Sequence, residues 1–187
     1  MAGSPAAERG QAVRRRLLEA AVELVPERGW SAVSTRILAE RAGVTPSVVH
    51  YHFPSLQALL IEGVLGAMRE VAGAFEPALE TIDTPEEAVD ALLASVGEYS
   101  GVDPMSSLFA EAYLTATRDD TLRQGIQEIL AGLRARFGGW LAERGVAEAD
   151  GTAGVLLATV DGLLLHRALE PESDRGVTAA VLRRLVN

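Results

Sequence analysis

Between Ser34 and Phe53 the chain concentrates short hydroxyl side chains, two histidines and a tyrosine. Hydroxyl and imidazole groups exchange hydrogen bonds with phosphates and base edges, and a valine methyl can meet the thymine methyl in the major groove. The outward-facing side chains are predicted to be Thr45, Ser47, Val48, His50, Tyr51 and His52. These residue types predict a contact with DNA.

Two short helices joined by a tight turn are expected to position these side chains. Ser34 is typical of a helix start, and Gly43 can adopt the positive φ that ends a helix sharply. Thr45 is expected to cap the second helix, and Pro46 suits the first helical position because a backbone N–H there would have no partner. Val49 would pack the second helix on the first. The pattern predicts a helix-turn-helix; an ordinary helical hairpin is the alternative.

Other chemistry finds little support in the sequence. His50 and His52 do not share a helix face, and no cysteine or third nearby histidine completes a metal site. The absence of cysteine also excludes disulfides and a catalytic thiol. No nucleophile elbow, P-loop or zinc-protease motif is present. We therefore expect a protein that is not an enzyme and that needs no cofactor or metal.

The segment AGVTPSVVHYHFPSLQALL resembles the signature of the tetracycline-repressor-like (TetR) family of transcriptional regulators. The shared elements are the AGV turn, a hydroxyl residue opening the recognition helix, the aromatic-x-His-Phe ending and a following helix that begins Ser-x-x-x-Leu-Leu. The resemblance covers roughly residues 11 to 60. Two positions depart from the family pattern: Leu56 replaces a lysine that usually reaches the DNA backbone, and His50 stands at the usual tyrosine position.

The predicted DNA contacts extend beyond the recognition helix to the helices that precede it. Arg14, Arg15 and Arg16 form a basic triplet that either contacts phosphates or remains a solvated face. The complete predicted set is Arg14, Ser34, Thr35, Arg36, Thr45, Pro46, Ser47, Val48, His50, Tyr51 and His52.

Charge divides the chain of 187 residues into two regions. The net charge is −9, yet residues 1–53 hold 7 arginines against 5 acids, whereas residues 54–187 hold 10 arginines against 21 acids. Only the amino-terminal region can approach phosphate without repulsion. The longest apolar run is too short to span a bilayer and no signal layout precedes it, so a cytoplasmic protein is expected.

Hydrophobic periodicity predicts an all-α fold with an amino-terminal three-helix DNA-binding domain and a helical carboxy-terminal domain for dimerisation, and the family resemblance implies that the second domain also binds a ligand. Residues 1–10 are predicted as a flexible arm, 11–54 as the DNA-binding domain and 55–187 as the second domain. Helices are expected at about 11–28, 34–42, 45–53, 55–75, 85–99, 103–117, 119–144 and 177–186, and a further helix is expected to start at 150 and to include the apolar run 155–165. Gly63, Gly66 and Gly73 make the fourth helix either a soft connector or a closely packed one.

The second domain is expected to form a homodimer and to enclose a small apolar effector. A helix that is apolar on all sides, such as the one over 155–165, must be covered on all sides. The predicted dimer interface comprises Ile126, Leu133, Phe137, Trp140, Leu157 and Leu164, and the predicted pocket comprises Met68, Phe75, Tyr99, Phe109 and Tyr113. Plain core packing is the alternative for the pocket residues.

The resemblance implies a repressor that an effector releases from a palindromic operator. The competing hypothesis is a dimeric DNA-binding protein without an effector.

Overall fold

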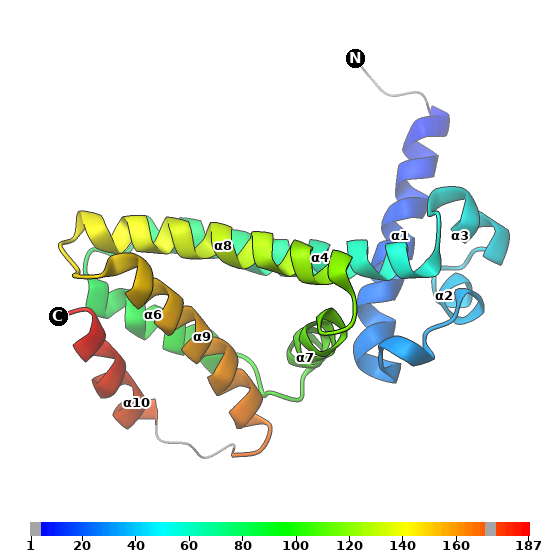
Figure 1. Ribbon diagram of the computed structural model, residues 1–187. Helices are drawn as coiled ribbons and strands as arrows, with labels where there is room; N and C mark the ends of the chain where they lie inside the picture. Colours follow the sequence, from blue (N-terminus) through cyan, green and yellow to red (C-terminus); the bar gives the residue numbers. More distant parts are fainter. Residues whose placement is uncertain (1–4, 171–174) are drawn as a thin grey trace. The chain divides into compact units, whose positions relative to one another are not determined.

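The computed structural model describes residues 5–170 and 175–187, and all regular structure in these residues is helical, as predicted (Figure 1). The elements are α1 Pro5–Arg28, η1 Trp30–Ala32, α2 Thr35–Arg41, α3 Pro46–His52, α4 Leu56–Gly73, α5 Phe75–Leu79, α6 Pro85–Gly97, α7 Pro104–Ala116, α8 Asp120–Glu143, α9 Ala149–Arg167, α10 Arg175–Leu182 and η2 Arg183–Leu185. Within the described ranges, no helix combines the length and apolar character needed to cross a membrane.

Two compact units divide the described chain. The first contains the residues up to Met68 together with Leu108–Arg123, and the second contains Arg69–Ser107 together with the residues from Gln124 onward. The units do not divide at residue 54, because Gly63 of α4 packs on α1 and because Glu111 of α7 and Asp119, just before α8, accept hydrogen bonds from Trp30 and Gln57.

The first helix begins at Pro5 instead of Gln11, so the prediction of a flexible arm is wrong for residues 5–10. Residues 1–4 lie outside the described residues. Alanine favours helix, and Glu8 places a negative charge in the first turn, where the helix dipole favours it. At the other end the helix runs through Pro26 to Arg28, and Gly29, with φ 81°, ends it.

The core of the first unit is formed by fully buried side chains from four helices. Leu17 and Leu24 belong to α1, Leu38 to α2, Val49 to α3 and Leu59 to α4. Each fully buried leucine or valine contributes about 1.5–3 kcal/mol through removal of its apolar surface from water. The core therefore fixes the orientation of α3 against α1 and α2.

The glycines of α4 have different surroundings. A Cβ atom at Gly63 would lie 3.2 Å from both the Ala21 Cβ and the Leu18 carbonyl oxygen, whereas a Cβ at Gly66 or Gly73 would meet nothing within 4 Å. Gly63 thus serves close packing of α4 on α1. The helix ends at Gly73, before its predicted end near Phe75, and the short helix α5 follows.

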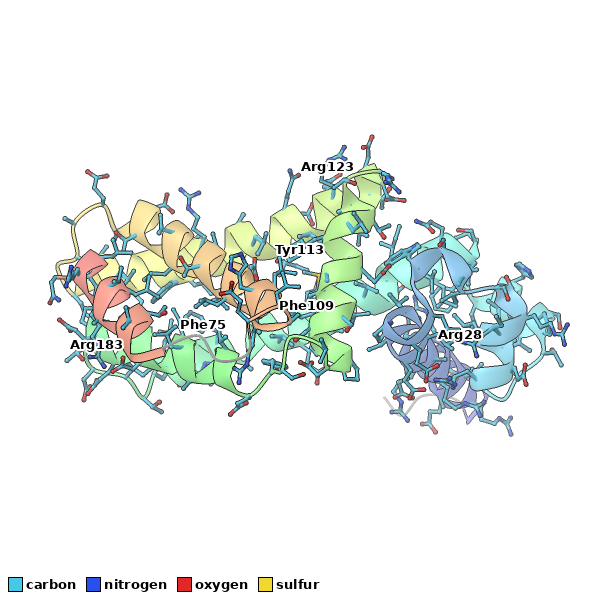
Figure 2. The ribbon with its side chains drawn as sticks, turned by 90° about the horizontal axis from the view of Figure 1, so that it is seen from below. Arg28, Phe75, Phe109, Tyr113, Arg123 and Arg183 are labelled. Atoms are coloured by element: carbon cyan, nitrogen blue, oxygen red, sulfur yellow. The ribbon has the colours of Figure 1, made fainter. Side chains whose placement is uncertain are left out.

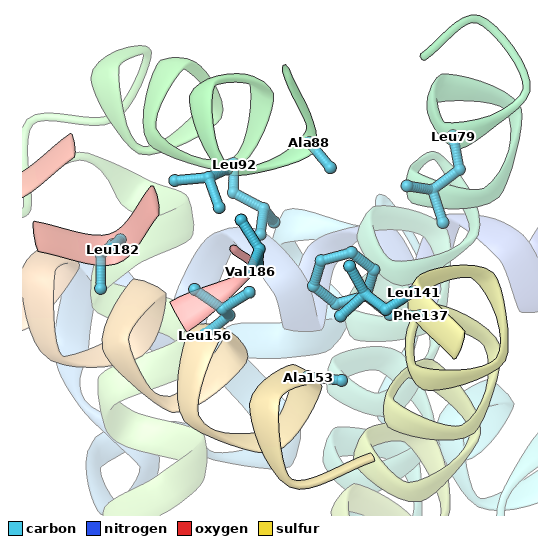
Figure 3. Close-up of a cluster of buried hydrophobic side chains, with 10 residues drawn as sticks. Leu79, Ala88, Leu92, Phe137, Leu141, Ala153, Leu156, Leu182 and Val186 are labelled. Atoms are coloured by element: carbon cyan, nitrogen blue, oxygen red, sulfur yellow. The ribbon is translucent and has the colours of Figure 1, made fainter. Parts of the chain in front are cut away.

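The core of the second unit lies among α5, α6, α8, α9 and the carboxy-terminal residues (Figure 3). Phe137 and Leu141 of α8 are fully buried in it, and Leu156 of α9 is 1% exposed. The close approach of α8 and α9 depends on Gly138, where a Cβ would lie 3.1 Å from the Asp150 Cα. The remaining members of the cluster are Leu79, Ala88, Val89, Leu92, Ala153, Leu182 and Val186.

Polar contacts fix the ends of the helices in the second unit. A capping box begins α6: the Glu87 backbone N–H donates to the Thr84 hydroxyl, and the Glu87 carboxylate accepts from the Thr84 backbone N–H. Arg183 donates to the Asp90 carboxylate at 2.7 Å, which holds the carboxy-terminal end of the chain on α6. That end was predicted as one helix over 177–186, but α10 ends at Leu182 and η2 continues it.

Candidate nucleic-acid interface

Local hydrogen bonds set the geometry of the turn between α2 and α3. The Ile37 backbone N–H donates to the Ser34 hydroxyl at 3.3 Å, so Ser34 caps α2 as predicted. Gly43 has φ 65°, the left-handed conformation predicted for it. The Val44 N–H then donates to the Ala39 carbonyl at 2.9 Å and closes the turn. The chain therefore enters α3 along a fixed path.

The start of α3 differs from the prediction, because the Thr45 side chain does not cap the helix. The Thr45 backbone carbonyl accepts from the Val48 N–H at 3.0 Å, and Pro46 has no N–H to satisfy. The Thr45 hydroxyl lies instead 2.9 Å from the Ser47 hydroxyl. Two exposed hydroxyl groups are thus paired at the beginning of the helix.

The two faces of α3 have different environments. Val49 is 1% exposed and Phe53, the residue that follows the helix, is 2% exposed, whereas Tyr51 is 84% exposed. The other exposed or half-buried predicted contacts on this segment are Thr45, Pro46, Ser47, Val48 and His50. The structure therefore presents these predicted residues together on one outward surface.

His52 is less outward than predicted. Its ring is half-buried and stands edge-on to the Tyr51 ring, with centroids 5.1 Å apart. A Cβ atom at Gly10 of α1 would lie 4.0 Å from the His52 Cε1 atom. His52 therefore contributes to the contact between α3 and the start of α1.

Of the predicted contacts outside α3, Ser34 and Arg36 are exposed and Thr35 is half-buried at the start of α2. Arg14 has a different environment. Its guanidinium carbon lies 4.7 Å from the centroid of the Phe53 ring, and Nη2 forms an ion pair with Glu62 of α4. The Arg14 guanidinium therefore joins α1 to the end of α3 and to α4, and its predicted phosphate contact stays a prediction.

Ion pairs also engage other arginines of this region. Arg41 donates to Glu23 at 3.0 Å and to Glu27 at 2.6 Å, and the hydrogen bond from Arg41 lowers the pKa of Glu27. Arg15 lies 3.5 Å from Glu19. The Arg41 contacts join α1 to α2, whereas the Arg15–Glu19 pair lies within α1.

A hydrogen-bonded chain links η1 to the start of α4 and to the turn before α8. The Trp30 indole N–H donates to Gln57 at 3.1 Å, and the Gln57 amide donates to Asp119 at 2.9 Å. The Trp30 backbone N–H donates to Glu111 of α7 at 3.0 Å. Hydrogen bonds from the Leu122 backbone and from Gln57 lower the pKa of Asp119. The sequence gives no local signal for these partners, because they are distant from Trp30 along the chain.

The predicted pocket residues fall into different environments. Phe109 and Tyr113 lie one turn apart on α7 and are half-buried (Figure 2), and Met68 of α4 is 5% exposed. Tyr99 is half-buried just after α6. The Phe75 ring packs edge-on against Phe137, with centroids 5.2 Å apart, so Phe75 belongs to the core of the second unit.

The predicted dimer-interface residues differ in their exposure to solvent. Ile126 is 4% exposed and Phe137 is fully buried within the chain. Leu133, Trp140, Leu157 and Leu164 are half-buried. The apolar side chains of α9 and its end that remain exposed are Val155 at 54%, Leu165 at 51% and Leu169 at 82%. Sequence periodicity missed these because every side of α9 is apolar.

Comparison with known proteins agrees with this geometry. The chain matches a family model described as bacterial regulatory proteins of the tetR family over residues 17–62 and a tetracyclin repressor-like C-terminal domain over residues 83–187. The transcriptional regulator BetI of Rhizobium meliloti is 30% identical over 169 residues, which are 84% of this chain and 78% of BetI.

Solved structures share the fold. The regulator SCO7518 of Streptomyces coelicolor is 30% identical with a TM-score of 0.79, covering 94% of this chain and 98% of that one. A regulator from Saccharomonospora viridis, solved in complex with choline, has a TM-score of 0.72 at 22% identity, covering 92% and 94%.

Proposed function

Because this chain belongs to the TetR family of transcriptional regulators, we propose that it is a dimeric repressor that leaves a palindromic operator when a small molecule binds. The observation that carries the proposal is the exposed face of α3 on a helix-turn-helix whose other face is buried. Such a helix enters the major groove, with the residues near its start against base edges. Binding to DNA would be consistent with the cytoplasmic location expected from the sequence.

The side chains of α3 are proposed to divide into two kinds of contact. Ser47 and Val48 lie in the first turn and would meet base edges, where a hydroxyl group and a methyl group distinguish base pairs. Thr45, at the helix boundary, and Tyr51, whose ring is 84% exposed, would reach phosphates. His50 adds a further exposed donor beside them.

A homodimer is supported by the exposed apolar stripe on α9. Val155, Leu165 and Leu169 are more than half exposed, and Ala158 and Gly162 fall between them at alternating spacings of three and four residues. A Cβ atom at Gly162 would meet nothing within 4 Å, so a partner helix could approach closely. Such spacing forms a continuous helix-packing seam, and a second copy of the same seam would cover it by two-fold symmetry.

The half-buried aromatic pair of α7 supports a small-molecule site. Phe109 and Tyr113 lie one turn apart, and the tyrosine would add a hydroxyl group to an apolar surface. Residues 54–187 carry a net charge of −11, which favours a neutral or cationic effector over an anionic one. Choline, bound by the Saccharomonospora viridis relative, is a suitable probe because aromatic rings bind quaternary ammonium groups.

Selection of binding sites from random duplex DNA tests the regulator itself. We expect a palindromic consensus that the full-length protein binds tightly and reproducibly. Enrichment of no sequence would contradict sequence-specific regulation.

Addition of effector probes to the selected complex distinguishes an effector-released repressor from a regulator without effector. Choline and its neutral isostere dimethylbutanol are compared for DNA release and for the rise in melting temperature. Release by choline alone indicates recognition of a cation, and equal release by both indicates an apolar site. The variants Tyr113→Phe and Phe109→Ala are expected to bind DNA and to lose the response. If neither probe releases the DNA, these two compounds are excluded as effectors.

A further inference from the structure

The three arginines of the basic triplet of α1, at positions 14 to 16, have different surroundings. Arg14 is held over the Phe53 ring, and Arg15 lies 3.5 Å from the Glu19 carboxylate. Arg16 is exposed, and the ion pairs of residues 5–170 and 175–187 do not include it. Of the three adjacent arginines, Arg16 is therefore the one whose guanidinium group is available to a ligand.

The Arg16 side chain extends to the turn between α2 and α3. Its Nη1 atom lies 3.9 Å from the position that a Cβ atom of Gly43 would occupy. The paired hydroxyls of Thr45 and Ser47 follow two and four residues later, and all four residues are exposed. The Arg16 guanidinium group thus lies beside the exposed turn that leads into α3.

Few other arginines near the α2–α3 turn are available to bind a phosphate. Arg41 is held by Glu23 and Glu27, and the sequence contains no arginine or lysine from residue 42 to residue 68. The start of α4 offers only Leu56, which is half-buried, and Gln57, which bonds to Trp30 and Asp119. Apart from Arg36 in the first turn of α2, which is exposed, a phosphate beside this turn would therefore find its cation on α1.

We propose that Arg16 binds a backbone phosphate of the operator beside the α2–α3 turn. In helix-turn-helix complexes the first helix crosses the backbone and the second enters the groove, so the turn between them lies close to the sugar-phosphate strand. The planar guanidinium can donate two parallel hydrogen bonds to phosphate oxygens. The inference rests on the proposed DNA binding and names Arg16 as a member of the basic triplet that makes the predicted phosphate contact.

The test measures how the dissociation constant depends on salt for the selected operator and for an unrelated duplex. Loss of one phosphate contact lowers the slope of log K against log salt by about 0.9 and weakens both duplexes alike, by roughly eightfold near 0.1 M salt. Arg16→Gln is expected to show this change, and Arg16→Lys is expected to restore most of the slope.

Arg28→Gln is the matched control because it removes the same charge from an exposed arginine of the same helix. Arg28 lies 12 residues further along α1, or about 18 Å. That separation exceeds the screening length of about 10 Å at 0.1 M salt, so Arg28→Gln should leave the slope unchanged. Ethylation of the contacted phosphate should weaken the wild type and have no further effect on Arg16→Gln.

An unchanged slope in Arg16→Gln, an equal fall in Arg28→Gln, or unfolding of Arg16→Gln at 25 °C would each overturn the assignment. Failure of the wild type to bind any duplex would instead contradict the proposed function.

Discussion

The Asp103 carboxylate stabilises the start of α7 by accepting hydrogen bonds. Its carboxylate accepts from the Ser106 backbone N–H at 3.0 Å, from the Ser106 hydroxyl at 2.7 Å and from the Ser100 N–H at 2.9 Å. Burial raises the pKa of Asp103, but the hydrogen bonds outweigh it and lower the pKa from 3.8 to about 2. The ionised carboxylate therefore stabilises the folded state.

Asp103→Asn is expected to lower the free energy of unfolding at pH 7 by about 1 kcal/mol, after allowance for solvent screening of a partly exposed group. The folded-state pKa lies below the unfolded value, so the contribution is complete above about pH 5 and is lost as the pH falls toward 2. Urea denaturation at several pH values measures it. A difference between wild type and variant that stays constant down to pH 2.5 would show that the charge of Asp103 is irrelevant.

The recognition helix offers a prediction about specificity. Ser47→Ala and Val48→Ala are expected to change which base pairs are preferred, because a base-edge contact contributes about 1–3 kcal/mol of discrimination. Tyr51→Phe should weaken all sequences alike, since a phosphate contact carries little sequence information. Affinities for a panel of single-base operator variants measure both effects. If Tyr51→Phe reorders the panel while Ser47→Ala and Val48→Ala do not, the orientation proposed for α3 is wrong.

The glycines of α4 have different surroundings, so alanine substitutions at them should have different effects on stability. Gly63 packs against Leu18 and Ala21 of α1, whereas Gly66 faces open space. Gly63→Ala is expected to destabilise the protein by about 1–3 kcal/mol because the added methyl overpacks the helix contact. Gly66→Ala is expected to stabilise it by up to about 1 kcal/mol, since alanine favours helix.

Thermal or urea unfolding measures both variants of α4, and each serves as the other's control. Equal effects of the same sign would show that α4 does not pack on α1 at Gly63. If the flexibility of α4 also carries the effector response, Gly66→Ala should bind DNA normally and release it less readily.

Helix starts were predictable from sequence because their signals are local. Ser34 and Thr84 cap α2 and α6 as their side chains suggested. The Thr45 cap was wrong because the neighbouring Ser47 hydroxyl competes for the same side chain. The boundary between α4 and α5 was missed because the apolar pattern continues to Phe75, and the tertiary contact of Phe75 with Phe137 has no local signal.

At the scale of the whole molecule, the sequence identified the DNA-binding region but not the sides of the later helices. The helix-turn-helix combines turn chemistry, patterning and charge within a short segment. In α9 every side is apolar, so periodicity could not distinguish Leu156, which is buried in the core, from Val155, which is exposed. Similarly, the surroundings of Arg14 and Arg16 depend on contacts between helices that spacing does not specify.

The exposed stripe on α9 leads to a prediction about assembly. Leu165→Glu places a charge where a second copy is proposed to pack, and desolvation of an unpaired carboxylate opposes association. We expect a folded monomer at micromolar concentration by light scattering. Leu114→Glu is the matched control, because Leu114 is 58% exposed on α7, outside the stripe, and Leu165 is 51% exposed.

DNA affinity should follow the assembly state. In a dimer the second half-site binds at a high effective concentration, so its loss is expected to weaken operator binding by about 10²–10⁴-fold. Binding of Leu165→Glu to an isolated half-site should remain near the wild-type value, which separates lost assembly from a damaged recognition helix. If Leu165→Glu remained dimeric, or if Leu114→Glu became monomeric, the dimer interface would not lie on α9. Two copies joined through α9 would also explain a palindromic operator, because the symmetry of the DNA site follows that of the protein.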